Sequence, residues 1–140
     1  TFLTENAKRE GVKQTESGLQ YEVLEAGTGE IPNEKSTVRI HYHGSFIDGQ
    51  VFDSSITRNE PAEFNLDQVI SGWTEALQMM PEGSVWEVYL PPEKAYGEQG
   101  VPNSPIGPNE TLLFKIKLKA VPHDGSQPGL GQYPYRTHVK

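Results

Sequence analysis

The sequence predicts an α+β fold in which one short helix lies across the concave face of a strongly twisted antiparallel sheet of five or six strands. Three observations support this prediction. Several segments between residues 19 and 118 alternate apolar and polar residues, as half-buried strands do. In the central part of the chain, only residues 71–80 have helical apolar spacing. The 14 glycines and 11 prolines favour a turn-rich β structure over a helical bundle.

Composition excludes several classes of function. The 140 residues suffice for one domain with a core. The formal net charge of −7 argues against a nucleic-acid partner or an anionic membrane. The absence of cysteine excludes disulfides, thiol catalysis and cysteine metal sites, and leaves the compartment open. No apolar run approaches the roughly 20 residues of a membrane span, so we expect no membrane insertion.

The first segment is expected to be the end of a helix. Residues 1–10 favour a helix that Gly11 ends, and Lys8 and Arg9 suit its C-terminus. The thin apolar stripe of Phe2, Leu3 and Ala7 indicates the last turns of a longer helix. Residues 1–18 are therefore interpreted as a helix stub and linker.

Strands are expected in the domain that follows, residues 19–121. The alternating or extended segments are 19–23, 38–46, 51–54, 63–66, 85–90 and 112–118. Asp48-Gly49 is a strong hairpin signal. We interpret residues 55–60 as a loop or bulge, residues 93–96 as one helical turn and residues 97–109 as a long surface loop. Residues 122–140, rich in Pro and Gly, are expected to form a flexible tail.

The central helix is expected to begin near Ser71, a good N-cap residue, and to end at Pro81-Glu82-Gly83. Trp73, Leu77 and Met80 then share one face. Trp73 has two interpretations: a core residue, or an apolar floor beside the unpaired N–H groups of the first helical turn. The second arrangement would suit the binding of a peptide carbonyl.

A small-ligand site of the usual kind is an apolar pocket with a few convergent polar groups. The aromatic and aliphatic residues that could line one are Tyr42, Phe52, Phe64, Val69, Ile70, Trp73, Tyr96, Ile106 and Phe114. The polar candidates among them are Asp53, Arg58 and the tyrosine hydroxyls.

Four segments carry a resemblance to a known family. Residues 51–55 (Val-Phe-Asp-Ser-Ser), 69–73 (Val-Ile-Ser-Gly-Trp), 95–97 (Ala-Tyr-Gly) and 111–114 (Thr-Leu-Leu-Phe) resemble the signature segments of the FKBP-type peptidyl-prolyl cis-trans isomerases, in order and near their spacing. The likeness runs from Leu19 to Val121. Residues 17–21, 72–78 and 105–111 look most like the macrophage infectivity potentiator (Mip) branch, in which a long helix and a dimerisation region precede the catalytic domain.

The resemblance implies an FKBP-like fold and a folding helper that accelerates rotation about X–Pro bonds, inhibited by rapamycin or tacrolimus and associated with virulence in the Mip branch. By this resemblance, Trp73 forms the floor of the pocket, and the Ile70 N–H and the Tyr96 hydroxyl bind carbonyls. Asp53 lies at the rim, near Arg58. Catalytic roles fall on Asp53, Tyr96, Phe52, Trp73 and Phe114. Substrate or inhibitor contacts fall on Tyr42, Arg58, Phe64, Val69, Ile70 and Ile106.

Two residues depart from the well-known immunosuppressant-binding member. Ala62 occupies a position where that member has a phenylalanine, and Val101 occupies one where it has a histidine. One residue is also inserted between Pro102 and Ile106. These changes are expected at the mouth of the pocket, where they would alter substrate preference and not the reaction.

The implied partners are proline-containing polypeptides and macrolides, without a metal or cofactor. This piece is expected to be a monomer, and an upstream helical region would permit a dimer. The resemblance favours a secreted or cell-envelope location and leaves a cytoplasmic one open.

Several alternatives remain beside this interpretation. Asp53 either pairs with Arg58 and orients the bulge, which we favour, or acts with its charge on the substrate. A hydrolase would combine Ser54 or Ser55 with His41 or His43, but nothing in the sequence places them together. His41 and His43 as a metal pair lack a third ligand. The main alternative function is a non-catalytic module that binds proline peptides or macrolides.

Overall fold

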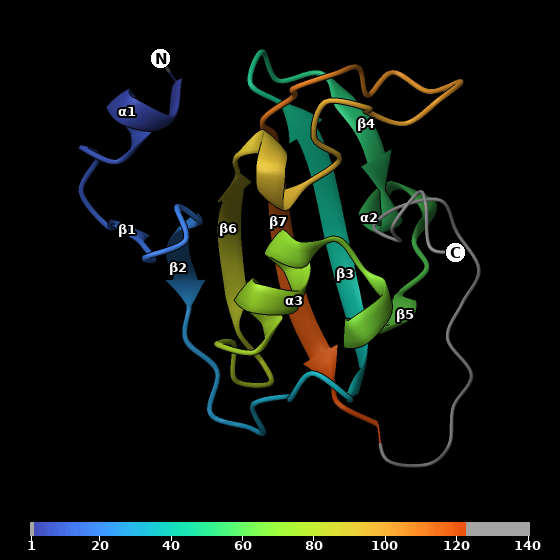
Figure 1. The fold of residues 1–140 in the computed structure, drawn as a ribbon. Helices are drawn as coiled ribbons and strands as arrows, with labels where there is room; N and C mark the ends of the chain where they lie inside the picture. Colours follow the sequence, from blue (N-terminus) through green and yellow to red (C-terminus); the bar gives the residue numbers. More distant parts are fainter. Residues whose placement is uncertain (1, 123–140) are drawn as a thin grey trace.

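The structure, a computed structural model, describes residues 2–122 and contains one antiparallel sheet (Figure 1). The predicted tail, apart from Pro122, lies outside the described residues. The strands of the sheet are β1 (Val12–Gln14), β2 (Gln20–Glu25), β3 (Thr37–Phe46), β4 (Val51–Ser54), β5 (Ala62–Asn65), β6 (Val85–Leu90) and β7 (Leu112–Ala120). The order is β1-β2-β6-β7-β3-β4, and β5 also pairs with β3. The predicted α+β class is confirmed, with seven strands in place of five or six.

The additional strand is β1, in the segment interpreted as a linker. Lys13 lies opposite Tyr21 of β2. With three residues, β1 is too short to show an alternating pattern. The helix before it, α1 (Phe2–Asn6), is also shorter than the predicted 1–10. The N–H groups of Lys8 and Arg9 bond three residues back, so tight turns replace further helix.

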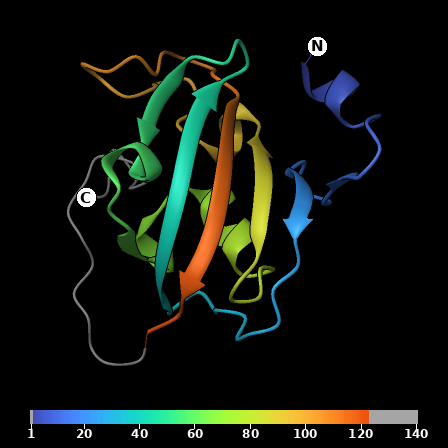
Figure 2. The same ribbon diagram turned by 180° about the vertical axis from the view of Figure 1, so that it is seen from behind.

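Alternation determines which face of the sheet is buried. In β7, Leu112, Phe114, Ile116 and Leu118 are fully buried, whereas Lys115, Lys117 and Lys119 are exposed, as predicted. The helix α3 (Ser71–Leu77) lies across the buried face (Figure 1). Seen from behind, β3 and β7 lie in front and α3 lies beyond them (Figure 2).

The helix α3 begins at Ser71, but Ser71 is not its N-cap. Ile70 occupies that position in an extended conformation, and its carbonyl accepts from the Trp73 and Thr74 N–H groups at 3.0 and 3.2 Å. The Thr74 hydroxyl donates to the Leu66 carbonyl at 2.7 Å, which ties α3 to the 3-10 helix η1 (Leu66–Gln68). The helix is shorter than the expected ten residues. The predicted shared face is confirmed, because Trp73, Leu77 and Met80 are fully buried.

The segment interpreted as a loop or bulge contains a one-turn helix, α2 (Ser55–Arg58). The Thr57 N–H donates to the Ser54 hydroxyl at 3.2 Å, and Asn59 closes the turn with a left-handed φ of 55°. A second short 3-10 helix, η2 (Pro92–Lys94), begins one residue before the predicted turn at 93–96. Residues 97–109 contain neither helix nor strand, as predicted.

Within residues 2–122, no helix combines the length and hydrophobicity needed to cross a bilayer.

Candidate active site

The centre of the candidate site is an aromatic cluster formed by Tyr42, Phe52, Phe64, Trp73 and Phe114. Three rings surround the Trp73 indole nearly edge to face: Phe114 with ring centroids 5.0 Å apart, Tyr42 at 5.4 Å and Phe64 at 5.7 Å. Phe52 stands edge-on to Phe114 at 5.6 Å. Perpendicular contacts of this kind are favourable for aromatic quadrupoles. The cluster joins β3, β4, β5, α3 and β7, so its geometry depends on how these five elements pack together.

Trp73 is fully buried, so it belongs to the core as well as to the aromatic cluster. Its Nε1 is buried and has no hydrogen-bond partner in the part of the chain that the structure describes. Phe52 and Asp53 are partly exposed, so they form the accessible side of the cluster.

Gly44 in β3 permits the close approach of two rings in the aromatic cluster. A Cβ atom at this position would lie 2.8 Å from Phe114 Cε1 and 2.8 Å from Phe52 Cζ. Carbon atoms in contact normally lie about 3.5–4.0 Å apart. Any side chain at Gly44 would therefore displace one of these rings.

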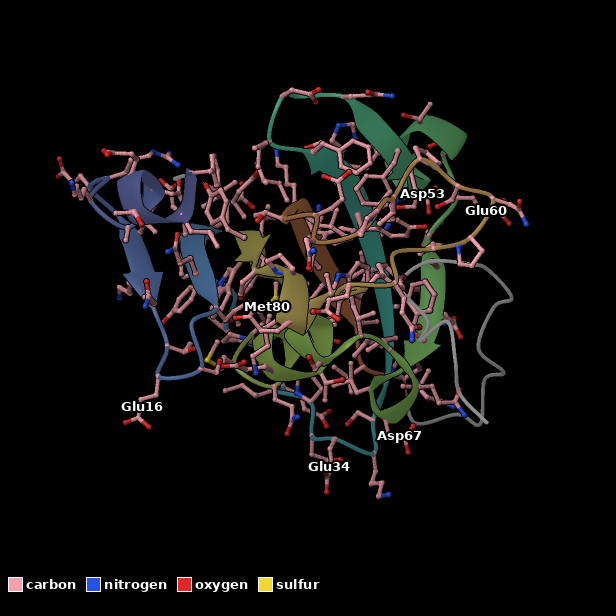
Figure 3. All side chains as sticks on the ribbon, turned by 45° about the horizontal axis from the view of Figure 1, so that its top comes forward. Glu16, Glu34, Asp53, Glu60, Asp67 and Met80 are labelled. Atoms are coloured by element: carbon pink, nitrogen blue, oxygen red, sulfur yellow. The ribbon has the colours of Figure 1, made fainter. Side chains whose placement is uncertain are left out.

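Asp53 is attached to the aromatic cluster by a short hydrogen bond. The Tyr42 hydroxyl donates to Asp53 Oδ2 at 2.5 Å. A bond to a carboxylate is stronger than one between neutral groups. Asp53 lies on β4, at the opposite end of the molecule from Glu34 and Asp67 (Figure 3). Because of the bond to Tyr42, the Asp53 carboxylate lies beside the aromatic rings in a fixed orientation.

The aliphatic candidates lie in the same buried core. Val69, Ile70 and Ile106 are at most 3% exposed, and Tyr96 is 9% exposed. Within residues 2–122, the Ile70 N–H meets no acceptor. Ile106 is held by its own loop, since the Val101 N–H donates to the Ile106 carbonyl at 2.9 Å and the Ser104 hydroxyl accepts from the Ile106 N–H at 3.1 Å.

The sequence predicts that Val101 and Ala62 lie at the mouth of the pocket and that Arg58 lies near Asp53. Val101, expected at the mouth, is 4% exposed and packs in the core because its loop folds back through the Val101–Ile106 bond. Ala62 is partly buried against the same core. Arg58 ends α2, but its side chain lies outside what the structure describes, so its pairing with Asp53 stays a prediction.

The structure brings together the histidines and serines that the sequence did not connect. His41 Nδ1 lies 2.9 Å from Ser55 Oγ, and His43 Nδ1 lies 3.0 Å from Ser54 Oγ. Both hydroxyls already serve the backbone: Ser55 accepts from the Tyr42 N–H at 2.8 Å, and Ser54 caps α2. Ser55 is fully buried and Ser54 is 5% exposed. These pairs therefore shape the bulge and do not present a nucleophile.

Burial, followed by the charges of Lys119 and Lys117, lowers the pKa of His41. Among residues 2–122, no three His, Asp or Glu side chains lie together so as to hold a metal ion.

Sequence reasoning missed Glu75 of α3. The Ser17 hydroxyl donates to its carboxylate, 2.6 Å from Oε1 and 2.9 Å from Oε2, and Lys94 Nζ lies 3.4 Å from Oε1. Burial is the largest influence on the Glu75 pKa and raises it. The hydrogen bonds from Ser17 and Thr15 and the Lys94 charge outweigh burial, so the pKa lies below its usual value of 4.5. No sequence pattern announces a contact between residues 58 positions apart.

Comparison with known proteins identifies the family. Residues 28–119 match the family model described as FKBP-type peptidyl-prolyl cis-trans isomerase. The chain belongs to this FKBP family. Residues 1–23 match a second model, the domain amino-terminal to FKBP-type isomerases.

FKBP relatives of several bacteria match most of the chain. The FKBP-type 22 kDa peptidyl-prolyl cis-trans isomerase of Escherichia coli K12 is 56% identical over 117 residues, which are 84% of this chain and 56% of the relative. The peptidyl-prolyl cis-trans isomerase Mip of Coxiella burnetii is 52% identical over 120 residues, 86% of this chain and 52% of the relative. The resemblance to the FKBP family and its Mip branch is confirmed. The chain spans about half the length of these curated relatives.

Solved FKBP structures agree with the observed fold. The crystal structure of FkpA from Escherichia coli has a TM-score of 0.82 at 48% identity and covers 86% of this chain and 55% of that one. The 1.6 Å structure of a peptidyl-prolyl cis-trans isomerase from Pseudomonas syringae has a TM-score of 0.80 at 40% identity. This match covers 86% of this chain and 87% of that one.

Proposed function

We propose that this chain is a peptidyl-prolyl cis-trans isomerase, which accelerates rotation about X–Pro bonds in proline-containing polypeptides. The observation that most supports this proposal is the aromatic cluster around Trp73, with Asp53 hydrogen-bonded to Tyr42 at the accessible side of the cluster. Membership in the FKBP family supports the same activity. The name peptidyl-prolyl cis-trans isomerase also belongs to relatives about half identical to this chain.

The reaction needs no covalent step. The X–Pro bond rotates over a barrier of about 20 kcal/mol and takes tens of seconds or more unaided. At the twisted transition state the amide loses resonance, and its carbonyl becomes less polarised. An apolar environment disfavours the polarised planar form and tolerates the twisted form better. Lowering the barrier by about 7 kcal/mol would give roughly five decades in rate.

The site residues divide this work between them. The prolyl ring is proposed to enter at the accessible side formed by Phe52 and Asp53 and to pack against Trp73. Around Trp73 it would meet residues that are at most 3% exposed, namely Tyr42, Phe64, Val69 and Ile106. Hydrogen bonds from the Ile70 N–H and the Tyr96 hydroxyl hold the peptide carbonyls, which selects the twisted geometry.

Phe52 and Phe114 form the wall beside Asp53. Asp53 orients this wall through the Tyr42 hydroxyl and through Arg58, because isomerisation has no obligatory proton transfer that a base would serve.

Macrolides such as rapamycin or tacrolimus are proposed to occupy the same site and inhibit the reaction. We further propose that this chain is a monomer, which light scattering after size-exclusion chromatography would test. We also propose a folding-helper role, and a role in virulence as the resemblance to the Mip branch implies.

The decisive experiment is magnetisation-transfer NMR of a model proline tetrapeptide with and without the protein. Acceleration of cis–trans exchange that tacrolimus abolishes supports the proposal. Saturable peptide binding without acceleration would replace it with the non-catalytic binding module. Unchanged spectra without binding would exclude both functions.

A further inference from the structure

The Glu75 carboxylate connects three segments that are distant in the sequence. Glu75 lies two residues after Trp73 in α3. Ser17, which donates to it, lies in the turn between β1 and β2, and Lys94 ends η2. The Thr15 and Ser17 hydroxyls lie 2.9 Å apart, so a second polar group supports the donor.

This connection differs from an ordinary surface ion pair. The side chains of Lys94 and Glu75 are 22% and 26% exposed, whereas those of Lys8 and Glu5 are 69% and 73% exposed. Fully exposed pairs are weak because solvent screens them and long side chains lose entropy. The Ser17 hydroxyl already fixes the Glu75 carboxylate in place. Less side-chain entropy is therefore lost when Glu75 pairs with Lys94.

The pair acts at the point where η2 lies against α3. A Cβ atom at Gly72 would lie 2.9 Å from the Lys94 carbonyl oxygen and 2.4 Å from Leu90 Cδ2, so the two segments are in direct contact. The chain reaches Tyr96 two residues after Lys94. The Ala95 and Gly97 N–H groups both donate to the Pro92 carbonyl, at 3.0 and 2.9 Å, so this turn is tight. A shift of Lys94 would therefore move Tyr96 relative to Trp73.

We propose that Glu75 is a positioning residue of the isomerase site, which holds Tyr96 at a fixed distance from Trp73 by clamping Lys94 to α3. This inference rests on the proposed function. Glu75 acts through Tyr96 and does not touch the substrate. Ser17 makes the clamp dependent on the turn that leads from the N-terminal segment into the sheet.

The test compares Glu75→Gln with the matched control Glu22→Gln. Glutamine keeps an acceptor for Ser17 but loses the charge that attracts Lys94. Glu22 forms an ion pair of similar length with Arg9, 3.3 Å against 3.4 Å, and its side chain is 25% exposed. That pair also joins the N-terminal segment to the sheet, but strand alternation places it on the face away from the aromatic cluster.

Rates are measured by magnetisation-transfer NMR at a temperature where circular dichroism shows every variant folded. We expect Glu75→Gln to lower kcat/KM about three- to tenfold, and Glu22→Gln to change it less than about twofold. In a Tyr96→Phe background, Glu75→Gln should cause no further loss, because the clamp then has no hydroxyl to position.

Three results would overturn the inference: wild-type rates in Glu75→Gln, an equal loss in Glu22→Gln, or an undiminished loss in the Tyr96→Phe background. An inactive wild-type chain would refute the proposed function instead. In that case the peptide Kd, followed by tryptophan fluorescence, becomes the readout. Equal Kd values for Glu75→Gln and wild type would then overturn the positioning role.

Discussion

Gly44→Ala offers a direct test of the geometry of the aromatic cluster. The added methyl group would lie 2.8 Å from one atom each of Phe114 and Phe52, which is roughly 0.7–1.2 Å too close. Phe114 is fully buried, and its ring is perpendicular to that of Trp73, so a shift of Phe114 would disturb the core. Phe52 is partly exposed, so we expect Phe52 to be displaced.

The expected loss of stability is that of an overpacked core, about 1–3 kcal/mol. At this chain length each kcal/mol lowers Tm by about 3–4 °C, so Tm should fall by roughly 3–12 °C. Because the displaced ring belongs to the proposed catalytic wall, kcat/KM should also fall about tenfold while the protein is still folded.

Urea denaturation measures the free energy of unfolding, and magnetisation-transfer NMR measures the rate. Gly107→Ala is the matched control, because its nearest contact would be Glu110 Oε2 at 3.7 Å. This control should stay within about 0.5 kcal/mol of wild type. A Gly44→Ala protein with wild-type stability and rate would show that the rings do not pack as described.

Three further substitutions test the polar groups. Asp53→Ala should lower kcat/KM about tenfold without abolishing it, because the Tyr42 hydroxyl loses its acceptor; unchanged exchange rates would remove Asp53 from the site. Tyr42→Phe should cost about 1–2 kcal/mol of unfolding free energy in urea, and no loss would mean that water replaces the bond. Burial raises the Glu87 pKa above 4.5 despite the nearby Lys115, so the folded state favours the protonated carboxyl. The contribution of this group to the free energy of unfolding is therefore fully present below pH 4.5 and is lost as the pH rises through the folded-state pKa. Glu87→Gln should therefore raise Tm at pH 7 and leave it unchanged near pH 4; calorimetry showing the reverse would contradict this sign.

The faces of the long strands were predictable because strand side chains alternate with a period of two. That rule placed Tyr42 and Phe114 on one face and Lys115 on the other, and the structure agrees. Once β3 and β7 pair with Gly44 opposite Phe114, this alternation accounts for the contact between Tyr42 and Phe114 in the aromatic cluster.

The elements that could not be predicted depend on contacts and not on local patterns. The strand β1 exists because β2 offers an edge to three residues with little alternation. The helix α2 looked like a polar loop because its stabilising groups, the Ser54 cap and the Ser55–Tyr42 bond, are themselves polar. The Ser17–Glu75 bond joins residues that only the complete fold brings together.

The division between rings and polar groups explains how one site could twist an amide without acid–base chemistry. The polar groups at the edges already bind one another: Tyr42 donates to Asp53, and Ser17 and Lys94 hold Glu75. In the proposed function they would therefore hold the walls in place before a substrate binds, which leaves little ordering for the binding step. A prolyl ring offers no hydrogen-bonding group to the Trp73 indole, so in the proposed function the contacts between them would be dispersive and hydrophobic. In the proposed function, loss of a polar group should lower the rate by loosening a wall of the site, whereas displacement of a ring should lower it by removing part of the surface against which the twisted proline would pack.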